Sequence, residues 1–322
     1  MEWEGKNVLI TGAGGFIGSH MAREILGRGS FVRAVDIKWD NYLPEPYYSE
    51  QLTLDLRKKE NVDESMKDID YVFNFAANMG GIGFITETGA DIMHDNVLIN
   101  ANMLQAAIEN DVDRMLYSSS ACVYPTYRQT DPDDVSLKEE DAYPADPDDF
   151  YGWEKLYTEK MCEAYGRDYG LDIRIVRYHN IYGPEGTYQG GREKSPAALC
   201  RKVVLASNPG EIEIWGDGKQ SRSYCYIDDC LEGTIKLMES SFKNPLNIGS
   251  DRLVTINELA DIIINISGKN INKTYNLSAP QGVRGRNADL TLLKQTLGWE
   301  PQISLEDGLG KTYKWIQKQL KL

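Results

Sequence analysis

The sequence is poor in cysteine and contains no long apolar run. Its 322 residues include five cysteines, and no two of them stand in Cys-x-x-Cys spacing. This argues against a disulfide framework or a zinc site and predicts free thiols, with Cys225 and Cys230 as core residues. No apolar run reaches the length of about 18 residues that a membrane span requires, and residues 1–5 lack the pattern of a signal peptide. We therefore expect a cytoplasmic protein.

Basic residues are too few to balance the acidic ones. Lysine and arginine number 35 against 49 aspartates and glutamates, which gives a formal net charge of −14. Long-range repulsion opposes binding to a nucleic-acid backbone or an anionic membrane, so we expect neither partner. The acid-rich stretch 131–149 lacks metal-ligand spacing and is interpreted as a solvated loop, so no metal site is expected. Any anionic ligand must find local cations.

Short apolar runs alternate with helical patterns through the first half of the chain. With 41% hydrophobic residues, 322 residues can bury a large core in one domain or in two interlocked ones. The alternation predicts an α/β fold in which helices cover a parallel sheet. Helices are expected at 16–26, 96–108 and 150–169, and strands at 8–11, 31–36, 51–55, 71–76, 114–119 and 173–178.

The alternation ends near residue 183, where loops rich in glycine and proline begin. We predict a sheet-containing domain over 1–182, to which 225–250 returns as a helix and a strand. A smaller α/β lobe is expected from 183–224 and 251–322. Within it, Thr255 and Glu258 form a capping-box pattern, and a last helix is expected at 305–320.

A glycine-rich turn after the first expected strand indicates a nucleotide site. Gly12, Gly15 and Gly18 lie between that strand and a helix that opens with Phe16 and Ile17. Such glycines let backbone amides approach a pyrophosphate at the helix N-terminus.

The second expected strand ends in a carboxylate. Asp36 lies 18 residues after Gly18, close to the spacing at which a carboxylate binds an adenosine ribose. The carboxylate of Asp36 would repel the 2′-phosphate of NADP, which favours NAD. Because the cation of Lys38 is close in sequence, NADP stays open as the alternative. Four other residues are predicted to line the adenine pocket or cofactor channel, or else to be ordinary strand-end residues: Asp55, Leu56, Ala76 and Ala77.

Tyr151 and Lys155 stand four residues apart on an expected helix, so they share one face. A lysine cation there stabilises the phenolate that a hydride-transferring enzyme uses as a base. Such a pair is common on surface helices, and a lone cysteine is usually a small buried residue. Cys122, however, follows Ser120 by two residues at the end of an expected strand, and a thiol beside the pair can take a proton from carbon. Together these residues favour an epimerase.

These motifs resemble the extended short-chain dehydrogenase/reductase superfamily over essentially the whole chain. The resemblance rests on the glycine turn, Asn74-Phe75-Ala76-Ala77, Ser120, Tyr151-x-x-x-Lys155 and Arg177-Tyr178-x-Asn180-x-Tyr182-Gly183-Pro184. It implies a Rossmann-type doubly wound parallel sheet that binds a nicotinamide cofactor. It also implies that Tyr151 is the catalytic base, that Lys155 lowers its pKa and binds the nicotinamide ribose, and that Ser120 hydrogen-bonds the reacting oxygen. Tyr178 is expected at the cofactor.

Five further segments resemble the GDP-mannose 3,5-epimerases: Ser120-Ala121-Cys122-Val123-Tyr124-Pro125 and residues 78–83, 190–197, 215–223 and 282–287. This narrower resemblance implies conversion of GDP-D-mannose to GDP-L-galactose, with the C5 epimer GDP-L-gulose, through transient C4 oxidation by bound NAD. It further implies that Cys122 and Lys194 form the acid/base pair, and that a homodimer forms through 96–108 and 150–169.

The chemistry is consistent with that implication. A C4 ketone makes the hydrogens at C3 and C5 acidic, because either carbanion becomes an enolate. A base on one face and an acid on the other can then invert a centre, each contributing about 10²–10⁴-fold. A cation such as Lys194 or Lys155 would lower the pKa of Cys122 toward working pH. Alternatively, Lys194 is only an exposed cation on a loop.

Cations that could bind substrate phosphates gather in the second lobe, where guanidinium groups make bidentate contacts. From Arg192, Arg201, Lys202, Arg222, Arg284 and Arg286, we favour Lys202, Arg222 and Arg284. Asn180 resembles an asparagine that contacts sugar phosphate in related enzymes, and Gly80 and Gly81 would let the backbone approach the hexose. Trp215 either packs on the base or fills the core.

Two alternative functions stay open at this point. A relative acting on another nucleotide sugar, such as a 4-epimerase, would not need Cys122. A non-catalytic NAD-binding sensor would not need Ser120, Tyr151 and Lys155, which are all present.

Overall fold

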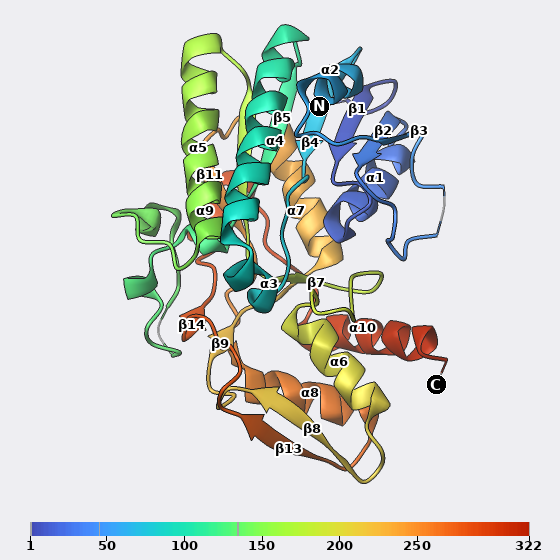
Figure 1. Ribbon diagram of the computed structural model, residues 1–322, viewed down its shortest axis with the longest axis vertical. Helices are drawn as coiled ribbons and strands as arrows, with labels where there is room; N and C mark the ends of the chain where they lie inside the picture. Colours follow the sequence, from blue (N-terminus) through green and yellow to red (C-terminus); the bar gives the residue numbers. More distant parts are fainter. Residues whose placement is uncertain (1, 45, 134, 322) are drawn as a thin grey trace.

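The computed structural model describes residues 2–44, 46–133 and 135–321. Its main feature is a parallel sheet of seven strands in the order β11-β6-β5-β4-β1-β2-β3 (Figure 1). The strand order reverses between β1 and β4, where open α/β sheets bind ligands at the carboxyl ends of their strands. The strands are β1 (Asn7–Thr11), β2 (Phe31–Asp36), β3 (Glu50–Thr53), β4 (Tyr71–Asn74), β5 (Arg114–Ser120), β6 (Ile173–Tyr178) and β11 (Pro245–Ile248).

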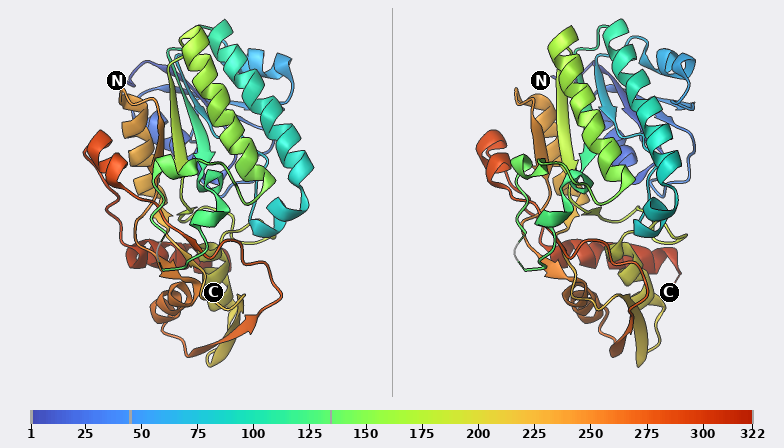
Figure 2. Two further views of the ribbon diagram at one scale, coloured as in Figure 1. Left: turned by 90° about the vertical axis from the view of Figure 1, so that its left-hand side faces the viewer. Right: turned by 60° about the vertical axis from the view of Figure 1, so that its left-hand side comes forward.

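Helices cover both faces of this sheet. Helices α4 and α5 pack side by side over one face with α2, and α1 and α7 pack together over the other (Figures 1 and 2). The predicted α/β fold with a doubly wound parallel sheet is therefore confirmed. These helices are α1 (Phe16–Gly27), α2 (Lys59–Met66), α4 (Gly89–Glu109), α5 (Phe150–Tyr169) and α7 (Ile227–Glu239).

Two buried apolar clusters hold the sheet between its helices. Alternate residues of β1 point to opposite faces, so Val8 and Ile10 join one cluster with Met21 of α1. Leu9 joins the other cluster with Met103 of α4. All five side chains are fully buried. Burial on both faces explains why the strands read as continuous apolar runs rather than as alternating patterns.

A smaller lobe lies below the carboxyl ends of the strands in Figure 1. Helix α6 (Ser195–Leu205) packs against α8 (Ile256–Ser267) and α10 (Leu305–Gln319), and the parallel strands β8 (Gly210–Trp215) and β13 (Ile271–Asn276) pair beside them. The predicted capping box is present at the start of α8. The Thr255 hydroxyl accepts a bond from the Glu258 N–H at 3.1 Å, and the Glu258 carboxylate accepts one from the Thr255 N–H at 2.7 Å.

Short elements connect the two parts. Strand β7 (Ile181–Tyr182) pairs with β10 (Cys225–Tyr226), which leads into α7, and the chain then enters the large sheet as β11. A three-stranded sheet joins β12 (Val254–Thr255), β9 (Ser221–Arg222) and β14 (Gly285–Arg286). Helix α9 (Thr291–Leu297) packs on β11 and α7. The remaining elements are α3 (Ile82–Glu87) and the 3-10 turns η1 (Ala121–Val123), η2 (Thr126–Arg128) and η3 (Glu139–Ala142).

Two predicted helices have different N-termini in the structure. The helix expected from 96 begins at Gly89, where a Cβ atom would come within 2.5 Å of the Phe150 ring, so α4 starts early against the N-terminus of α5. The helix expected from 225 begins at Ile227, because Cys225 and Tyr226 pair with β7. Cys225 and Cys230 are buried, and all five cysteines are free thiols, as predicted. Among the helices that the structure describes, none combines the length and the apolar character that crossing a membrane requires.

Candidate active site

The turn between β1 and α1 brings backbone segments together at glycines. At Gly12, where φ is +66°, a Cβ atom would lie 2.8 Å from the backbone of Phe75 and Ala76. A Cβ at Gly14 would collide with the Lys38 carbonyl, and one at Gly18 with the Gly12 carbonyl. The turn therefore requires glycine, and it leaves the N-terminal amides of α1 open to a diphosphate.

Asp36 is fixed at the end of β2 by backbone donors. Its carboxylate accepts hydrogen bonds from the N–H groups of Gly14 (2.9 Å), Ile37 (2.7 Å) and Lys38 (3.2 Å). Burial raises the pKa of Asp36, and these three bonds act in the opposite direction. Asp55 is held differently, because Arg57 donates to it at 2.8 and 2.9 Å and lowers its pKa.

A cavity of about 740 Å³ lies over the carboxyl ends of β1 and β4 and reaches into the smaller lobe. It brings together every residue that the sequence assigns to the cofactor, along with Ser120, Gly80 and Lys194 of the other predicted sets. The cofactor residues that line it are Gly12, Gly15, Phe16, Ile17, Gly18, Asp36, Asp55, Leu56, Ala76, Ala77, Tyr151, Lys155 and Tyr178.

The N-terminus of α5 presents Tyr151 and Lys155 to this cavity. Asp149 caps the helix by accepting a bond from the Gly152 N–H at 2.7 Å. The Lys155 ammonium donates to the Ser118 carbonyl at 2.9 Å and lies 5.6 Å from the centre of the Tyr151 ring. Their helical spacing, the helix cap and the end of β5 thus place the redox pair as the sequence predicts.

Without a bound cofactor, the surroundings of Tyr151 disfavour its phenolate form. Burial raises the pKa of Tyr151 well above its usual value, the charges of Cys122 and Glu154 raise it further, and a hydrogen bond from Ser120 lowers it. Burial is the largest of these effects, and a lowering of this pKa by Lys155 stays a prediction. Burial also lowers the pKa of Lys155 itself, and Glu154 is the first of the acidic groups that oppose this effect.

Cys122 lies in η1, directly after β5. Its N–H donates to the Ser120 hydroxyl at 3.2 Å, and its sulfur accepts from Arg286 Nη1 at 3.3 Å. Arg286 also donates to the Gln129 side chain at 2.5 Å, so its guanidinium is held against the thiol. The sequence reasoning did not select Arg286 over its neighbours.

Lys194 is the N-cap residue of α6, on the other side of the cavity. Its side chain is accessible from the cavity, yet protein atoms surround it and the loss of bulk solvent lowers its pKa. The charge of Cys122 opposes this lowering.

Several predicted substrate residues lie apart from the cavity lining. Lys202 donates to the Glu213 carbonyl at 2.6 Å and lies 5.9 Å from the Trp215 ring. Trp215 is 45% exposed, so it does not fill the core. Arg284 forms an ion pair with Asp217 of the same lobe at 3.2 Å.

Arg222 and Asn180 are held closer to the catalytic groups. Arg222 donates to the carbonyls of Ser221 and Gln281, and burial lowers its pKa to about 10, with the charge of Arg286 as the next cause. Asn180, with φ of 45°, donates to the Ser223 carbonyl at 3.0 Å.

Loops 79–84 and 190–194 meet across the mouth of the cavity. A Cβ atom at Gly81 would lie 3.1 Å from the Glu193 carbonyl, and the Arg192 guanidinium lies 3.9 Å from the centre of the Phe84 ring. This contact sets the loop that carries Lys194 against the loop that carries Gly80.

Three residues that the sequence reasoning missed support this site. Gly14 positions Asp36, and Arg286 contacts Cys122. Gly152 lets the N-terminus of α5 approach η1, because a Cβ there would collide with the Cys122 carbonyl. A glycine directly after the tyrosine of the Tyr-x-x-x-Lys motif was the available signal for the last.

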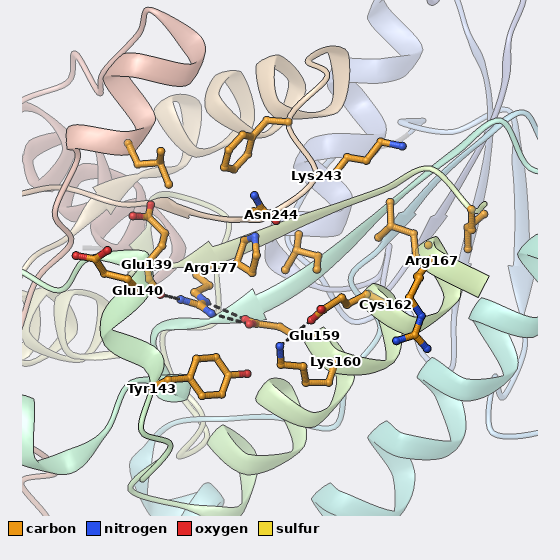
Figure 3. Close-up of a pocket in the computed structure, with 18 residues that line it drawn as sticks. Glu139, Glu140, Tyr143, Glu159, Lys160, Cys162, Arg167, Arg177, Lys243 and Asn244 are labelled. Carbon is orange, nitrogen blue, oxygen red and sulfur yellow. Dashed lines mark hydrogen bonds and ion pairs between the residues drawn. The ribbon is translucent and has the colours of Figure 1, made fainter. Parts of the chain in front are cut away.

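A second hollow of about 620 Å³ lies beside α5, β6 and β11 (Figure 3). Carboxylates and cations mix along it, and a buried ion pair joins Arg177 Nη2 to Glu159 Oε2 at 2.7 Å. None of the predicted site residues lines this hollow. The cavity at the glycine turn is therefore the candidate active site.

Known proteins resemble this chain in sequence and in fold. Residues 8–249 match the model of the NAD dependent epimerase/dehydratase family. GDP-mannose 3,5-epimerase of Arabidopsis thaliana is 46% identical over 322 residues, which cover 99% of this chain and 85% of that protein. The structure of UDP-glucose 4-epimerase from Thermotoga maritima with UDP-glucose has a TM-score of 0.88 at 29% identity, covering 98% of this chain and 99% of that one.

A structure of UDP-glucuronic acid 4-epimerase from Bacillus cereus, in complex with UDP-4-deoxy-4-fluoro-glucuronic acid and NAD, has a TM-score of 0.83 at 26% identity. It covers 98% of this chain and 99% of that one. The match of the family model to about three quarters of the sequence agrees with the glycine turn and the Tyr151–Lys155 pair at one cavity. The chain belongs to the NAD dependent epimerase/dehydratase family.

Proposed function

We propose that this protein is a GDP-mannose 3,5-epimerase that converts GDP-D-mannose to GDP-L-galactose and to the C5 epimer GDP-L-gulose. The observation that carries the proposal is the position of Cys122, whose N–H donates to the hydroxyl of Ser120 at 3.2 Å, while Ser120, Tyr151 and Lys194 line one cavity. Similarity to a relative of that name over 99% of this chain supports it.

NAD is the cofactor of this family, and the residues at the glycine turn fit it. The missing Cβ atoms of Gly12, Gly14 and Gly18 leave room for a diphosphate at the start of α1, and Asp36 is a fixed acceptor for ribose hydroxyls. When bound, NAD supplies a hydride acceptor that oxidises the sugar at C4 and later reduces it again. The chain's own groups have to move the accompanying protons.

Tyr151, Ser120 and Lys155 would serve the redox half of the reaction. As C4 loses hydride, Tyr151 takes the hydroxyl proton, and Ser120 hydrogen-bonds the oxygen that becomes the carbonyl. Because burial disfavours the phenolate, a positive charge close to the ring is needed, and Lys155 at 5.6 Å supplies one. In the return step Tyr151 gives the proton back to the alkoxide.

Cys122 and Lys194 would serve the epimerisation half. With C4 as a ketone, one group removes the proton at C5 or C3, and the electron pair delocalises onto the carbonyl oxygen as an enolate. The other group delivers a proton to the opposite face of the same carbon. Arg286 donates a hydrogen bond to the Cys122 sulfur at 3.3 Å and so helps to fix its position. Each proton transfer is worth about 10²–10⁴-fold in rate.

The substrate diphosphate would meet the cations of the smaller lobe. Arg222 is the nearest of the favoured set to the catalytic groups, since its charge acts on the same cluster as Arg286 and Cys122. Lys202 and Arg284, with Trp215, would bind further along the nucleotide. Asn180, Gly80 and Gly81 complete the proposed hexose subsite.

A homodimer through α4 and α5 is part of the proposal. Phe150, Trp153 and Tyr157 are 61%, 42% and 55% exposed and lie at helical spacing along α5, with Leu98 of α4 also exposed. Such an aromatic stripe is typical of a protein interface. Light scattering tests it, and a monomer would contradict it. The cytoplasmic location and the division into 1–182 with 225–250, and 183–224 with 251–322, stay predictions.

The proposed function is tested by incubating the purified protein with GDP-mannose in heavy water and following ring protons by NMR. Deuterium entering C3 and C5 is expected, and exchange at neither carbon contradicts the proposal. A 4-epimerase, as several structural relatives are named, would change the configuration at C4 without exchange at C3 or C5. A non-catalytic NAD sensor would do neither.

A further inference from the structure

The proposed mechanism does not use Glu154, a buried carboxylate that stands between Tyr151 and Lys155 in the sequence. Glu154 lies on α5 with no exposed surface. Oxygen Oε1 accepts hydrogen bonds from Asn100 Nδ2 at 3.0 Å and from the Thr158 hydroxyl at 3.0 Å. Oxygen Oε2 accepts one from Asn96 Nδ2 at 3.1 Å. Glu154 therefore joins α5 to α4 through two amide donors, and the third donor, Thr158, lies on α5 itself.

The direction of these hydrogen bonds is fixed from the cofactor loop. The Ala76 N–H donates to Thr11 Oγ1 at 3.1 Å, and the Thr11 hydroxyl donates to Asn74 Oδ1 at 2.8 Å. Asn74 Nδ2 then donates to Asn100 Oδ1 at 2.9 Å, which leaves the Asn100 amide nitrogen to face Glu154. Every bond from Ala76 onward points its hydrogen toward the carboxylate.

The second amide donor is fixed independently. The Asn78 N–H donates to Asn96 Oδ1 at 2.6 Å, so Asn96 also presents its nitrogen to Glu154. The amides of Asn96 and Asn100 offer Glu154 only donors, whereas the Thr158 hydroxyl can rotate. The arrangement therefore fits an acceptor-only carboxylate.

A buried negative charge requires a compensating positive one. Among the residues that the structure describes, the ion pairs within 4.0 Å include none at Glu154. The cation next to Glu154 in the sequence is Lys155, which is 1% exposed and whose charge Glu154 stabilises against burial. Glu154 is the largest of these opposing contributions, ahead of Cys162, Cys122 and Glu159.

We propose that Glu154 is a positioning residue that holds the positive charge of Lys155 and, through its amide donors, ties the catalytic helix α5 to the cofactor loop at Ala76. It touches neither cofactor nor reacting atoms. The catalytic part of this inference rests on the proposed function, whereas the charge balance with Lys155 does not.

The predicted consequence is a shift in pH dependence. Removing the negative charge in Glu154→Gln lowers the pKa of Lys155, because the charge opposed burial. It also lowers the pKa of Tyr151, which Glu154 raises. The other charged groups that face these two residues, Cys122, Asp149, Glu159 and Cys162, are unchanged. Both limbs of the pH profile for hydride transfer should therefore move to lower pH, by about one unit or more.

Lys155 itself provides a readout that does not depend on the substrate. Protein labelled with ¹³C-lysine is titrated by NMR, and the Lys155 signal is assigned by its loss in Lys155→Met. We expect the titration midpoint to fall in Glu154→Gln, and to stay near the wild-type value in Glu154→Asp, which keeps a carboxylate. Glu163→Gln removes an equal charge from the exposed side of the same helix, where Glu163 pairs with Lys160, and should leave the midpoint unchanged.

An unchanged Lys155 midpoint in Glu154→Gln overturns the proposal, whatever the substrate. If wild-type protein titrates as expected but never turns over GDP-mannose, the proposed function fails and the charge balance stands. If Glu154→Gln does not fold, the double variant Glu154→Gln with Lys155→Met is tested instead. Both side chains are then neutral, so no uncompensated cation stays buried. Folding of the double variant supports the proposal, and its failure to fold shows that hydrogen bonding, not charge, is what Glu154 supplies.

Discussion

Replacing Cys122 with alanine separates the redox groups from the epimerising groups. The substitution removes a half-buried sulfur whose hydrogen bond comes from Arg286, and Arg286 keeps its 2.5 Å bond to Gln129. The backbone bond from Cys122 to Ser120 is untouched. We therefore expect the free energy of unfolding to fall by about 1 kcal/mol or less.

The effect on the reaction should be much larger. If Cys122 moves a proton at C3 or C5, its loss slows exchange at these carbons by about 10²–10⁴-fold, or about 3–5 kcal/mol of transition-state stabilisation. Hydride transfer needs Tyr151, Ser120 and Lys155, none of which is changed. Reduction of bound NAD by GDP-mannose should therefore persist in the variant while isotope exchange is lost.

The assay measures both halves on the same sample. Absorbance of the reduced nicotinamide follows C4 oxidation, and NMR in heavy water follows deuterium entry into the sugar. Exchange at the wild-type rate in Cys122→Ala would refute the assignment of Cys122 as a proton-transfer group. Loss of cofactor reduction together with exchange would show that Cys122 acts in the redox half instead.

Three further substitutions test the cofactor site and the fold. Asp36→Asn should weaken NAD binding about tenfold and reduce the preference of the protein for NAD over NADP, because a hydrogen bond to a charged acceptor is worth about 1.5–3 kcal/mol. Fluorescence titration with both cofactors measures the two affinities. An unchanged ratio of the two affinities contradicts the prediction. Arg177→Met leaves the buried Glu159 without its ion pair and should lower the free energy of unfolding in urea by about 3–5 kcal/mol, whereas Arg167→Met at the exposed pair with Asp168 should leave it nearly unchanged. Burial lowers the pKa of His179 to about 3, so the unfolded chain binds a proton below pH 6.5 that the folded chain refuses, and stability falls as pH drops from 6.5 toward 3. His179→Gln should flatten that decline by up to about 1.4 kcal/mol per pH unit, and an unaltered slope in urea midpoints would contradict it.

The elements predicted from the sequence with success are those set by local chemistry. The strands that begin the fold are apolar on both faces, so their positions follow from runs such as Val8–Thr11 with little ambiguity. The glycine turn, the Thr255 capping box and the helical spacing of Tyr151 and Lys155 are likewise local patterns. Each needs only a few neighbouring residues, and the structure contains all of them.

The choice among cations could not be made in this way. Arg284 and Arg286 are two residues apart in one motif, yet Arg284 pairs with Asp217 and Arg286 contacts Cys122. Their difference arises because β14 is two residues long and pairs Arg286 with Arg222 of β9, a register that no local pattern reveals. Tertiary packing also decided the start of α4, where Gly89 meets Phe150.

The origin of each group explains how one redox core can serve different reactions. Ser120, Tyr151 and Lys155 come from β5 and α5, which are fixed by the sheet and by the cap at Asp149. Cys122, Lys194 and Arg286 come instead from η1, the start of α6 and the short strand β14, three segments distant in sequence. Arg286 contacts the Cys122 sulfur, and Lys194 lines the cavity. We predict that changes in these segments alter proton transfer at the ring carbons and leave hydride transfer at C4 unchanged. If the proposed roles hold, the segments around Cys122 and Lys194 therefore carry the specificity of the reaction, while the sheet and α5 carry the oxidation that makes it feasible.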